Sequence, residues 1–349
     1  MSLRVGLRLP ACQRADRVAA AAAAAEAAGF DSVWVPDSQL LWRDTFASLA
    51  LAAASTSRIT LATGVTNLVT RHVSVVASAA RTVQELAPER FVLALGAGRS
   101  AAGMIGAAST PTRALEEALH ALRALLSGGS WPLGGVPARL TGAAGACPVY
   151  LGAGGPRNLR LACAEADGVI LTGSLSAAEV TRSAADIRAF VAQSAQPGRP
   201  FDLVLWIRAH VSDGSVPDPR QWKPAVAIAL MNAPAGTAED LGVDPLILRR
   251  ARGLQSDGTH NADWAESVAS CDALISDEAA IGYARRYCLY GTPEEISRQA
   301  TGLEQAGVTT LITTPLAGDT TFSLPRDFVD SFAATGLIGA TECPVRPGG

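Results

Sequence analysis

The sequence predicts an α/β protein in which parallel strands close into a (β/α)8 TIM barrel with insertions. Two observations predict this fold. Short apolar runs alternate with longer helical patterns along most of the chain, and the runs number eight, each followed by a helical pattern or an irregular excursion. Eight right-handed units of this kind close into a barrel more readily than they form an open sheet. An open doubly wound sheet is the alternative.

The first half of the barrel is the most regular part of the sequence. Four apolar runs predict strands at residues 3–9, 32–36, 58–62 and 90–95. Helical patterns follow them at residues 16–28, 45–54, 72–86 and 111–126. Gly29 is expected to end the first helix, because glycine adopts the left-handed conformation that closes helices.

The second half contains two interruptions. Strands are expected at residues 148–151, 168–171, 201–210 and 308–313, with helices at 157–166, 177–193 and 292–306. The last helix begins with Thr292-Pro-Glu-Glu, a capping box with proline at its first position. Residues 127–146 are rich in Gly and Pro and predict an excursion or small hairpin, and residues 233–278 form a second excursion. We expect one barrel domain over residues 1–349.

Composition excludes several function classes. The chain has 349 residues, 29 basic and 32 acidic side chains, 48% hydrophobic and 17% charged residues, which predicts a packed core and excludes general disorder. The isoelectric point near 5.9 and the lack of a basic run longer than Arg249-Arg250 argue against nucleic-acid binding. No uninterrupted apolar stretch is long enough to span a membrane. The six cysteines and four histidines show no zinc-ligand spacing, so we expect no metal site and a cytoplasmic protein.

Two glycine-rich turns follow predicted strands, where barrel enzymes place their active sites. Gly96-Ala-Gly-Arg-Ser-Ala101 fits the G-x-G-x-x-A dinucleotide fingerprint, but the acidic residue that this fingerprint requires at the end of the next strand is missing. Gly152-Ala-Gly-Gly-Pro156 opens the next helix and offers its N-terminus to an anion. Together the turns favour one long phosphorylated ligand. The alternative is that the glycines only make tight turns.

Four segments carry a family resemblance: Gly29 to Asp37 (GFDSVWVPD), Ile59 to Asn67 (ITLATGVTN), Gln84 to Phe91 (QELAPERF) and Pro148 to Pro156. They resemble the luciferase-like monooxygenase superfamily and, within it, the coenzyme F420-dependent reductases of the methylenetetrahydromethanopterin reductase type. The resemblance extends to Tyr290-Gly-Thr-Pro-Glu-Glu-Ile296 and so covers nearly the whole chain. It implies a barrel that holds a deazaflavin or a flavin at the C-terminal ends of its strands, usually in a dimer.

The resemblance also implies site residues. The cofactor-binding positions are Asp37, Thr63, Gly64, Val65, Thr66, Asn67, Gly96, Ala97, Gly98, Gly152, Ala153, Gly154, Gly155 and Pro156. A cis peptide bond is implied at Gly64–Val65. The catalytic position falls on Asp37 and Ser38. Several deazaflavin enzymes carry histidine where Ser38 stands, so Asp37 or a bound water is expected to supply the proton.

Two arginines depart from the family pattern. Arg8 aligns with a carboxylate of the reductases, and Arg99 replaces a common acidic residue after the fourth strand. They point to an anionic group of the substrate or to the acidic tail of the cofactor, although Arg8 could instead pair with a carboxylate such as Asp37. Trp42 follows Asp37 at the spacing of an aromatic residue that lines the substrate site of the sugar-phosphate dehydrogenase branch. Its alternative role is packing. Arg8, Trp42 and Arg99 are therefore the expected substrate-binding residues.

The expected function is an F420-dependent oxidoreductase that transfers a hydride between the deazaflavin and a small-molecule C=N or C=C substrate. One alternative is an FMN-dependent monooxygenase that uses reduced flavin and oxygen. Another is a catalytically degenerate member that only binds the cofactor. A homodimer and a partner enzyme that reduces the cofactor are the expected associations.

Overall fold

Eight parallel strands form a closed barrel in the computed structural model, which describes residues 3–142, 147–215, 218–233, 236–244, 246, 264–316 and 326–339. The strands follow the order β1-β2-β3-β5-β8-β9-β10-β12, and pairing of β12 with β1 closes the ring. Their bounds are β1 (Arg4–Arg8), β2 (Ser32–Val35), β3 (Thr60–Thr63), β5 (Phe91–Gly96), β8 (Val149–Ala153), β9 (Gly168–Leu171), β10 (Asp202–Val211) and β12 (Thr310–Pro315). The predicted barrel and all eight predicted strands are confirmed.

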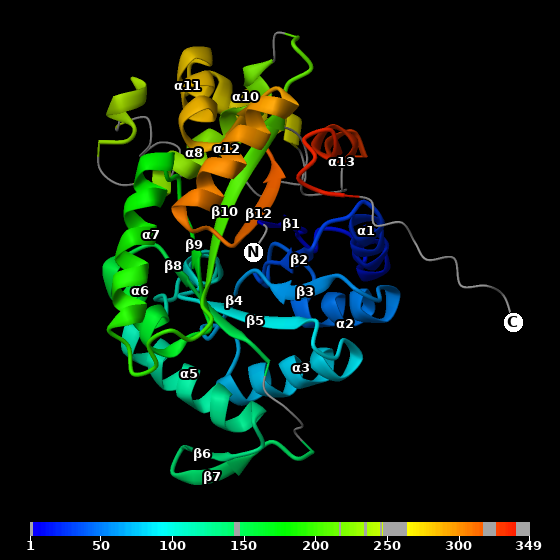
Figure 1. Cartoon of the computed structure of the whole chain (residues 1–349), viewed down its shortest axis with the longest axis vertical. Helices are drawn as coiled ribbons and strands as arrows, with labels where there is room; N and C mark the ends of the chain where they lie inside the picture. The colour runs from blue at the N-terminus through cyan, green and yellow to red at the C-terminus, as the bar shows by residue number, and fades with distance from the viewer. Residues whose placement is uncertain are drawn as a thin grey trace, which may run out of the picture.

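Helices cover the outside of the barrel (Figure 1). They are α1 (Ala15–Ala27), α2 (Thr45–Ser55), α3 (Val73–Leu86), α5 (Thr112–Leu126), α6 (Pro156–Glu165), α7 (Ala177–Ala192) and α12 (Pro293–Ala306). The short helix α4 (Arg99–Gly103) follows β5, and α13 (Arg326–Ala333) lies beside α1, where Phe332 stacks on Phe30. Thr292 caps α12 through the predicted capping box. Each helix in the first list lies within two residues of its expected bounds.

Side chains along each strand alternate between two cores. One set, including Leu61, Leu93 and Leu311, is fully buried between the strands and the helices. The other set points into the barrel and forms a small central cluster around Trp34 and Tyr150. The alternation continues to the end of each strand. The last inward-pointing residue of a strand therefore faces the barrel mouth.

The first excursion contains the expected hairpin, with β6 (Ser130–Leu133) antiparallel to β7 (Val136–Arg139). Residues 143–146 of this expected excursion lie outside the described residues. The hairpin follows α5 and packs Trp131 against His120 of that helix.

The second excursion begins earlier than expected, directly after β10. It contains η1 (Pro219–Trp222), α8 (Lys223–Asn232), η2 (Glu239–Leu241), α10 (Trp264–Asp272) and α11 (Asp277–Tyr287) before β11 (Leu289–Gly291). Within the expected range of 233–278, residues 234–235, 245 and 247–263 are outside the described part. Figure 1 shows β10 extending toward these helices, and β11 pairs with its outer end.

The helices of this insertion have their own apolar core around Trp222 and Tyr283. Lys223, the single lysine of the chain, is 3% exposed in this region. Its ammonium group lies 2.6 Å from Asp272 and 2.7 Å from Asp277. Two half-exposed carboxylates therefore neutralise the one buried ammonium group, as burial of a charge requires.

Gly29 ends α1 as expected and also allows Gly339, in the segment after α13, to pack against the end of that helix. Its φ is +88°, and the amide of Phe30 donates to the carbonyl of Ala25 at 3.1 Å. A Cβ atom on Gly29 would lie 1.8 Å from the carbonyl oxygen of Gly339. A side chain at this position would therefore displace the segment that follows α13.

We predict that Gly29→Ala destabilises the protein by about 2–5 kcal/mol, the sum of a left-handed backbone cost and a steric clash. Gly135→Ala is the matched control, because Gly135 has φ +82° but, within the described ranges, no atom beyond its chain neighbours lies within 4 Å of the position of a Cβ. It should cost about 1–2 kcal/mol. Urea unfolding followed by circular dichroism measures both, and equal losses would contradict the packing role of Gly29.

Candidate active site at the barrel mouth

The turn after β3 places Val65 in the barrel mouth between the ends of two other strands. The peptide bond Gly64–Val65 is cis, which confirms the position implied by the resemblance. A Cβ atom on Gly96 would lie 2.6 Å from Cγ2 of Val65, and one on Gly152 would lie 3.3 Å from its Cγ1. Glycine at these positions therefore leaves room for the Val65 side chain at the ends of β5 and β8.

A buried ion pair joins the end of β2 to this turn. Asp37 is 6% exposed, and its carboxylate accepts hydrogen bonds from Thr66 Oγ1 at 2.7 Å and from Arg71 Nε and Nη2 at 2.7 and 3.2 Å. Arg71 also pairs with Asp44 at 2.6 Å. Burial alone would lower the pKa of Arg71, but the hydrogen bonds to both aspartates outweigh it and raise that pKa. Asp37 therefore pairs with Arg71, and the alternative that it pairs with Arg8 is not found.

Several of the other predicted cofactor residues use their polar groups to hold the same turn. The Thr63 hydroxyl bridges β3 and β5, accepting from the Ala94 amide at 2.7 Å and donating to its carbonyl at 2.8 Å. Asn67 Oδ1 accepts from the amides of Val69 and Thr70 at 3.1 Å each. Their direct contact with a cofactor stays a prediction.

The segment after β5 packs against the catalytic position that the resemblance implies. Ser38 is buried, and its hydroxyl lies 3.0 Å from that of Ser100 in α4. The carbonyl of Ala97 accepts from the Thr110 amide at 2.8 Å, and Gly98 has φ +71°. The loops after β2 and β5 are therefore in contact, and Ser38 lies in that contact.

The second glycine-rich turn leads from β8 into α6. Ala153 ends the strand, Gly155 is the N-cap residue, and Pro156 is the first residue of the helix. Among the described residues no side chain caps α6, and apart from the neighbours of Gly155 in the chain none of their atoms lies within 4 Å of the position that a Cβ on Gly155 would occupy. The N-terminus of α6 is thus open beside an unfilled space, an arrangement that suits an anionic group such as a phosphate.

Arginine and tryptophan side chains form the opposite side of the mouth. The Arg8 guanidinium lies 5.3 Å from the ring centroids of both Trp42 and Trp206, and the Arg208 guanidinium lies 5.8 Å from Trp206. Burial and, after it, the charge of Arg208 lower the pKa of Arg8 to about 10. In the described part of the chain no carboxylate forms an ion pair with either arginine.

The structure thus brings together two of the three expected substrate residues, Arg8 and Trp42. Arg99 is exposed at the first position of α4, and its side chain forms no hydrogen bond or ion pair with another described residue. Sequence reasoning missed Arg71, Trp206 and Arg208. The last two alternate along the predicted strand 201–210, and this period of two could have shown that both face the barrel.

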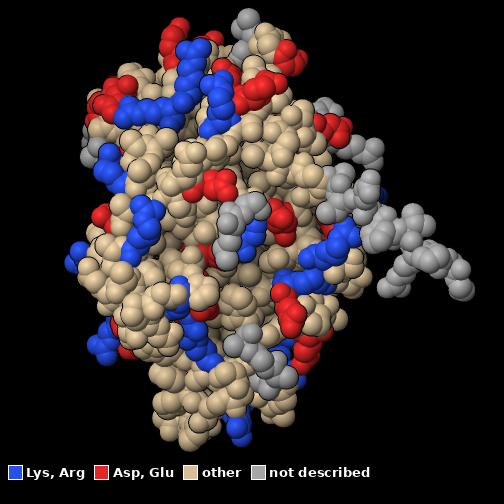
Figure 2. Space-filling model, in the orientation of Figure 1, with Lys and Arg blue, Asp and Glu red and all other residues tan. Residues whose placement is uncertain are grey.

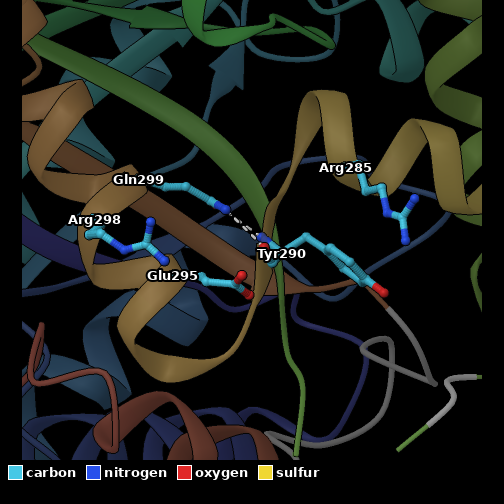
Figure 3. A pocket seen from close by; sticks show the side chains of 5 residues that line it. All are labelled: Arg285, Tyr290, Glu295, Arg298 and Gln299. Atoms are coloured by element: carbon cyan, nitrogen blue, oxygen red, sulfur yellow. Dashed lines mark hydrogen bonds between the residues drawn. The ribbon is translucent and has the colours of Figure 1, made fainter. Parts of the chain in front are cut away.

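A separate hollow of about 520 Å³ lies outside the mouth, lined by Arg285, Tyr290, Glu295, Arg298 and Gln299 (Figure 3). The Gln299 side chain pairs with both backbone polar groups of Tyr290, at 3.1 and 2.8 Å, and so joins α12 to β11. The Tyr290 ring stacks on His210 with centroids 5.7 Å apart. Burial lowers the pKa of His210, which favours the neutral ring in this contact. No expected site residue lines this hollow.

Charges of both signs are mixed over the face drawn in Figure 2, with acidic side chains beside the basic ones at its upper end. Among the described residues, no three His, Cys, Asp or Glu side chains gather in a way that could hold a metal ion. None of the helices that the structure describes is both long and apolar enough to cross a membrane.

The barrel mouth has backbone turns on one side and arginine and tryptophan side chains on the other. This arrangement is an enzyme site of the (β/α)8 class. Comparison with known proteins gives the family. Residues 2–310 match the family model of the luciferase-like monooxygenases, and the chain belongs to this family.

Three similar proteins are oxidoreductases. The chain is 27% identical to the 5,10-methylenetetrahydromethanopterin reductase of Methanolobus tindarius, over 85% of this chain and 89% of that protein. It is 43% identical to the F420-dependent glucose-6-phosphate dehydrogenase of Beutenbergia cavernae, over 28% of this chain and 32% of that protein. The structure of the coenzyme F420-dependent tetrahydromethanopterin reductase from Methanopyrus kandleri superposes with a TM-score of 0.75 and 20% identity, covering 96% and 98% of the two chains. The resemblance seen in the sequence is confirmed, and the chain is an oxidoreductase.

We predict that Arg71→Gln destabilises the protein by about 3–5 kcal/mol, because it leaves the buried Asp37 carboxylate without its cation. Arg81→Gln is the matched control, since Arg81 forms a partly exposed pair with Glu85 on α3. It should cost less than about 1 kcal/mol. Thermal and urea unfolding of both variants measure the difference, and an Arg71→Gln loss as small as that of the control would refute the structural role of the pair.

Proposed function

We propose that this protein is an F420-dependent oxidoreductase that transfers a hydride between the deazaflavin and the C=N or C=C bond of a small-molecule substrate. The observation that carries the proposal is the backbone-built half of the mouth, formed by Val65 and the glycine ends of β5 and β8. The F420-dependent enzymes among the similar proteins support the choice of cofactor.

The residues of this half fit a flat ring with a phosphorylated chain. Val65 would support one face of the ring, and the absence of side chains at Gly96 and Gly152 leaves the room that Val65 needs to take this position. The open space at Gly155 and the uncapped N-terminus of α6 would accept the phosphate. The bound deazaflavin would supply the hydride chemistry, while the chain orients the reactants and excludes water.

Asp37 fits the role of a positioning residue. Its carboxylate accepts three hydrogen bonds from Arg71 and Thr66, and these hold the turn that carries Val65. A carboxylate held in this way is an acceptor, so we propose that a bound water supplies the proton, with Ser38 at the catalytic position that the resemblance implies. The homodimer and the partner enzyme that reduces the cofactor stay predictions.

The proposal is tested by equilibrium titration of the purified chain with F420 and, in parallel, with FMN, followed by cofactor fluorescence. Micromolar binding of F420 without binding of FMN supports the proposal and leads to assays with imines and enones. The reverse result, together with oxygen uptake in the presence of reduced FMN, identifies a monooxygenase. F420 binding without hydride transfer to any tested acceptor identifies a member that only binds the cofactor.

A substitution at Gly155 tests whether the β8–α6 turn binds the cofactor or whether its glycines only allow the chain to turn. Gly155 has an extended backbone with φ −141°, so Gly155→Leu introduces no left-handed strain and costs only about 1 kcal/mol of helix capping. If the turn holds the cofactor, the leucine side chain fills its space and lowers F420 affinity by about tenfold or more. Gly302→Leu, on α12 with similarly open surroundings, is the control. Equal F420 affinity in the two variants would show that the glycines serve only the turn.

A further inference from the structure

Three polar side chains lie at one level on adjacent strands of the barrel. Arg208 of β10 is the register partner of Thr314 of β12. Leu7 of β1 pairs with Thr313, so Arg8 lies level with Thr314 on the other side. Thr314 follows the interior residue Ile312 by two positions and therefore also faces into the barrel. The row Arg8–Thr314–Arg208 forms part of the wall of the mouth.

Some hydrogen-bonding groups in and beside this row have no partner among the described residues. Thr314 is 1% exposed, and its hydroxyl has no hydrogen-bond partner among the described residues. The indole nitrogen of Trp206, one level deeper, is also buried without a partner there. Arg208 donates to the carbonyl of Pro315 at 3.2 Å, but no carboxylate in the described ranges neutralises it or Arg8. Arg8 and Arg208 are partly buried on either side of Thr314, and the charge of Arg208 acts on Arg8. Two such cations repel each other, and an oxyanion between them would relieve that repulsion.

The row lies opposite the backbone-built half of the mouth. In the ring of eight strands, β8 is four places from β1, β5 is four places from β12, and β3 is four places from β10. The glycine ends and Val65 therefore face the two arginines across the barrel axis. A group held by the row and a ring held on Val65 would lie on either side of the axis, with Trp42 and Trp206 beside the space between them.

We propose that the substrate carries an oxyanion, a carboxylate or a phosphate, which Arg8 and Arg208 bind with the help of the Thr314 hydroxyl. The assignment to the substrate and not to the cofactor rests on the proposed function, because that function places the cofactor on the opposite side. Arginine suits this role because its planar guanidinium binds two oxygens of a carboxylate or phosphate at once. The flanking tryptophans favour a substrate with a planar apolar body next to the anionic group.

The test uses three probes that share a phenyl ring and differ in the charge of the group attached to it: benzoate, phenyl phosphate and benzyl alcohol. Isothermal titration calorimetry on the full chain measures their binding to the wild type and to Arg8→Gln, Arg208→Gln and Arg113→Gln. Arg113, which is 89% exposed and pairs with Glu117, is the control for loss of a charge. We expect one or both anions to bind, and benzyl alcohol to bind at least about tenfold more weakly.

Arg8→Gln and Arg208→Gln should each weaken the binding of the anion by about tenfold or more, while Arg113→Gln leaves it unchanged. Circular dichroism checks that each variant is folded, and Arg208→Lys, which keeps the charge but not the paired donors, should bind with intermediate affinity. Failure of both anions to bind the wild type, equal binding of benzoate and benzyl alcohol, or unchanged binding in both glutamine variants would overturn the proposal.

Titration of the same variants with F420 separates this proposal from the proposed function. Unchanged F420 affinity in Arg8→Gln and Arg208→Gln supports assignment of the row to the substrate. A loss of F420 affinity in both variants would overturn that assignment, because the arginines would then hold the acidic tail of the cofactor. Anion binding by a wild type that binds no F420 would overturn the proposed cofactor and leave the anion site standing.

Discussion

In a closed ring of parallel strands, every side chain points either outward to the helices or inward to the barrel axis. This constraint determines which residues can form the site. Side chains that alternate outward pack under the helices, while those that alternate inward share the narrow interior. At the mouth, the inward positions of the eight strands meet, although they come from segments spread over most of the sequence. Val65 and the glycine ends come from β3, β5 and β8, and the arginines come from β1 and β10. Neither half of the mouth exists until the ring is closed.

The strands and helices could be predicted because their signals are local. Strands buried on both faces appear as short apolar runs, and Gly29 and Thr292 mark a helix end and a helix start through chemistry that acts within a few residues. The positions of the cofactor turn came from the resemblance, and the cis bond at Gly64–Val65 agrees with it. These predictions depend on neighbours along the chain or on motifs that are continuous in sequence.

The missed residues depend on contacts between distant segments. Arg71 is 34 residues from Asp37, and nothing near either residue indicates that they pair. Thr63 illustrates the reverse case, because its place in the motif suggests ligand binding while its hydroxyl bridges two strands. The insertion after β10 begins earlier than the sequence predicts, because its first α-helix, α8, is an apolar segment without the periodicity of an amphipathic helix. Its core forms around Trp222, which no local pattern marks.

The two halves of the mouth also differ in how readily mutation can change them. The half at β3, β5 and β8 depends on the absence of side chains, and a Cβ atom at Gly64 or Gly96 would collide with Trp34 or Val65. A side chain at either of these two glycines therefore displaces Trp34 or Val65. Arg8, Trp206 and Arg208 instead project from strand positions where side chains are present, and Trp42 projects from the loop after β2. Evolution can therefore change the side chains that recognise a substrate on one side of the mouth without altering the glycines that seat Val65 on the other side.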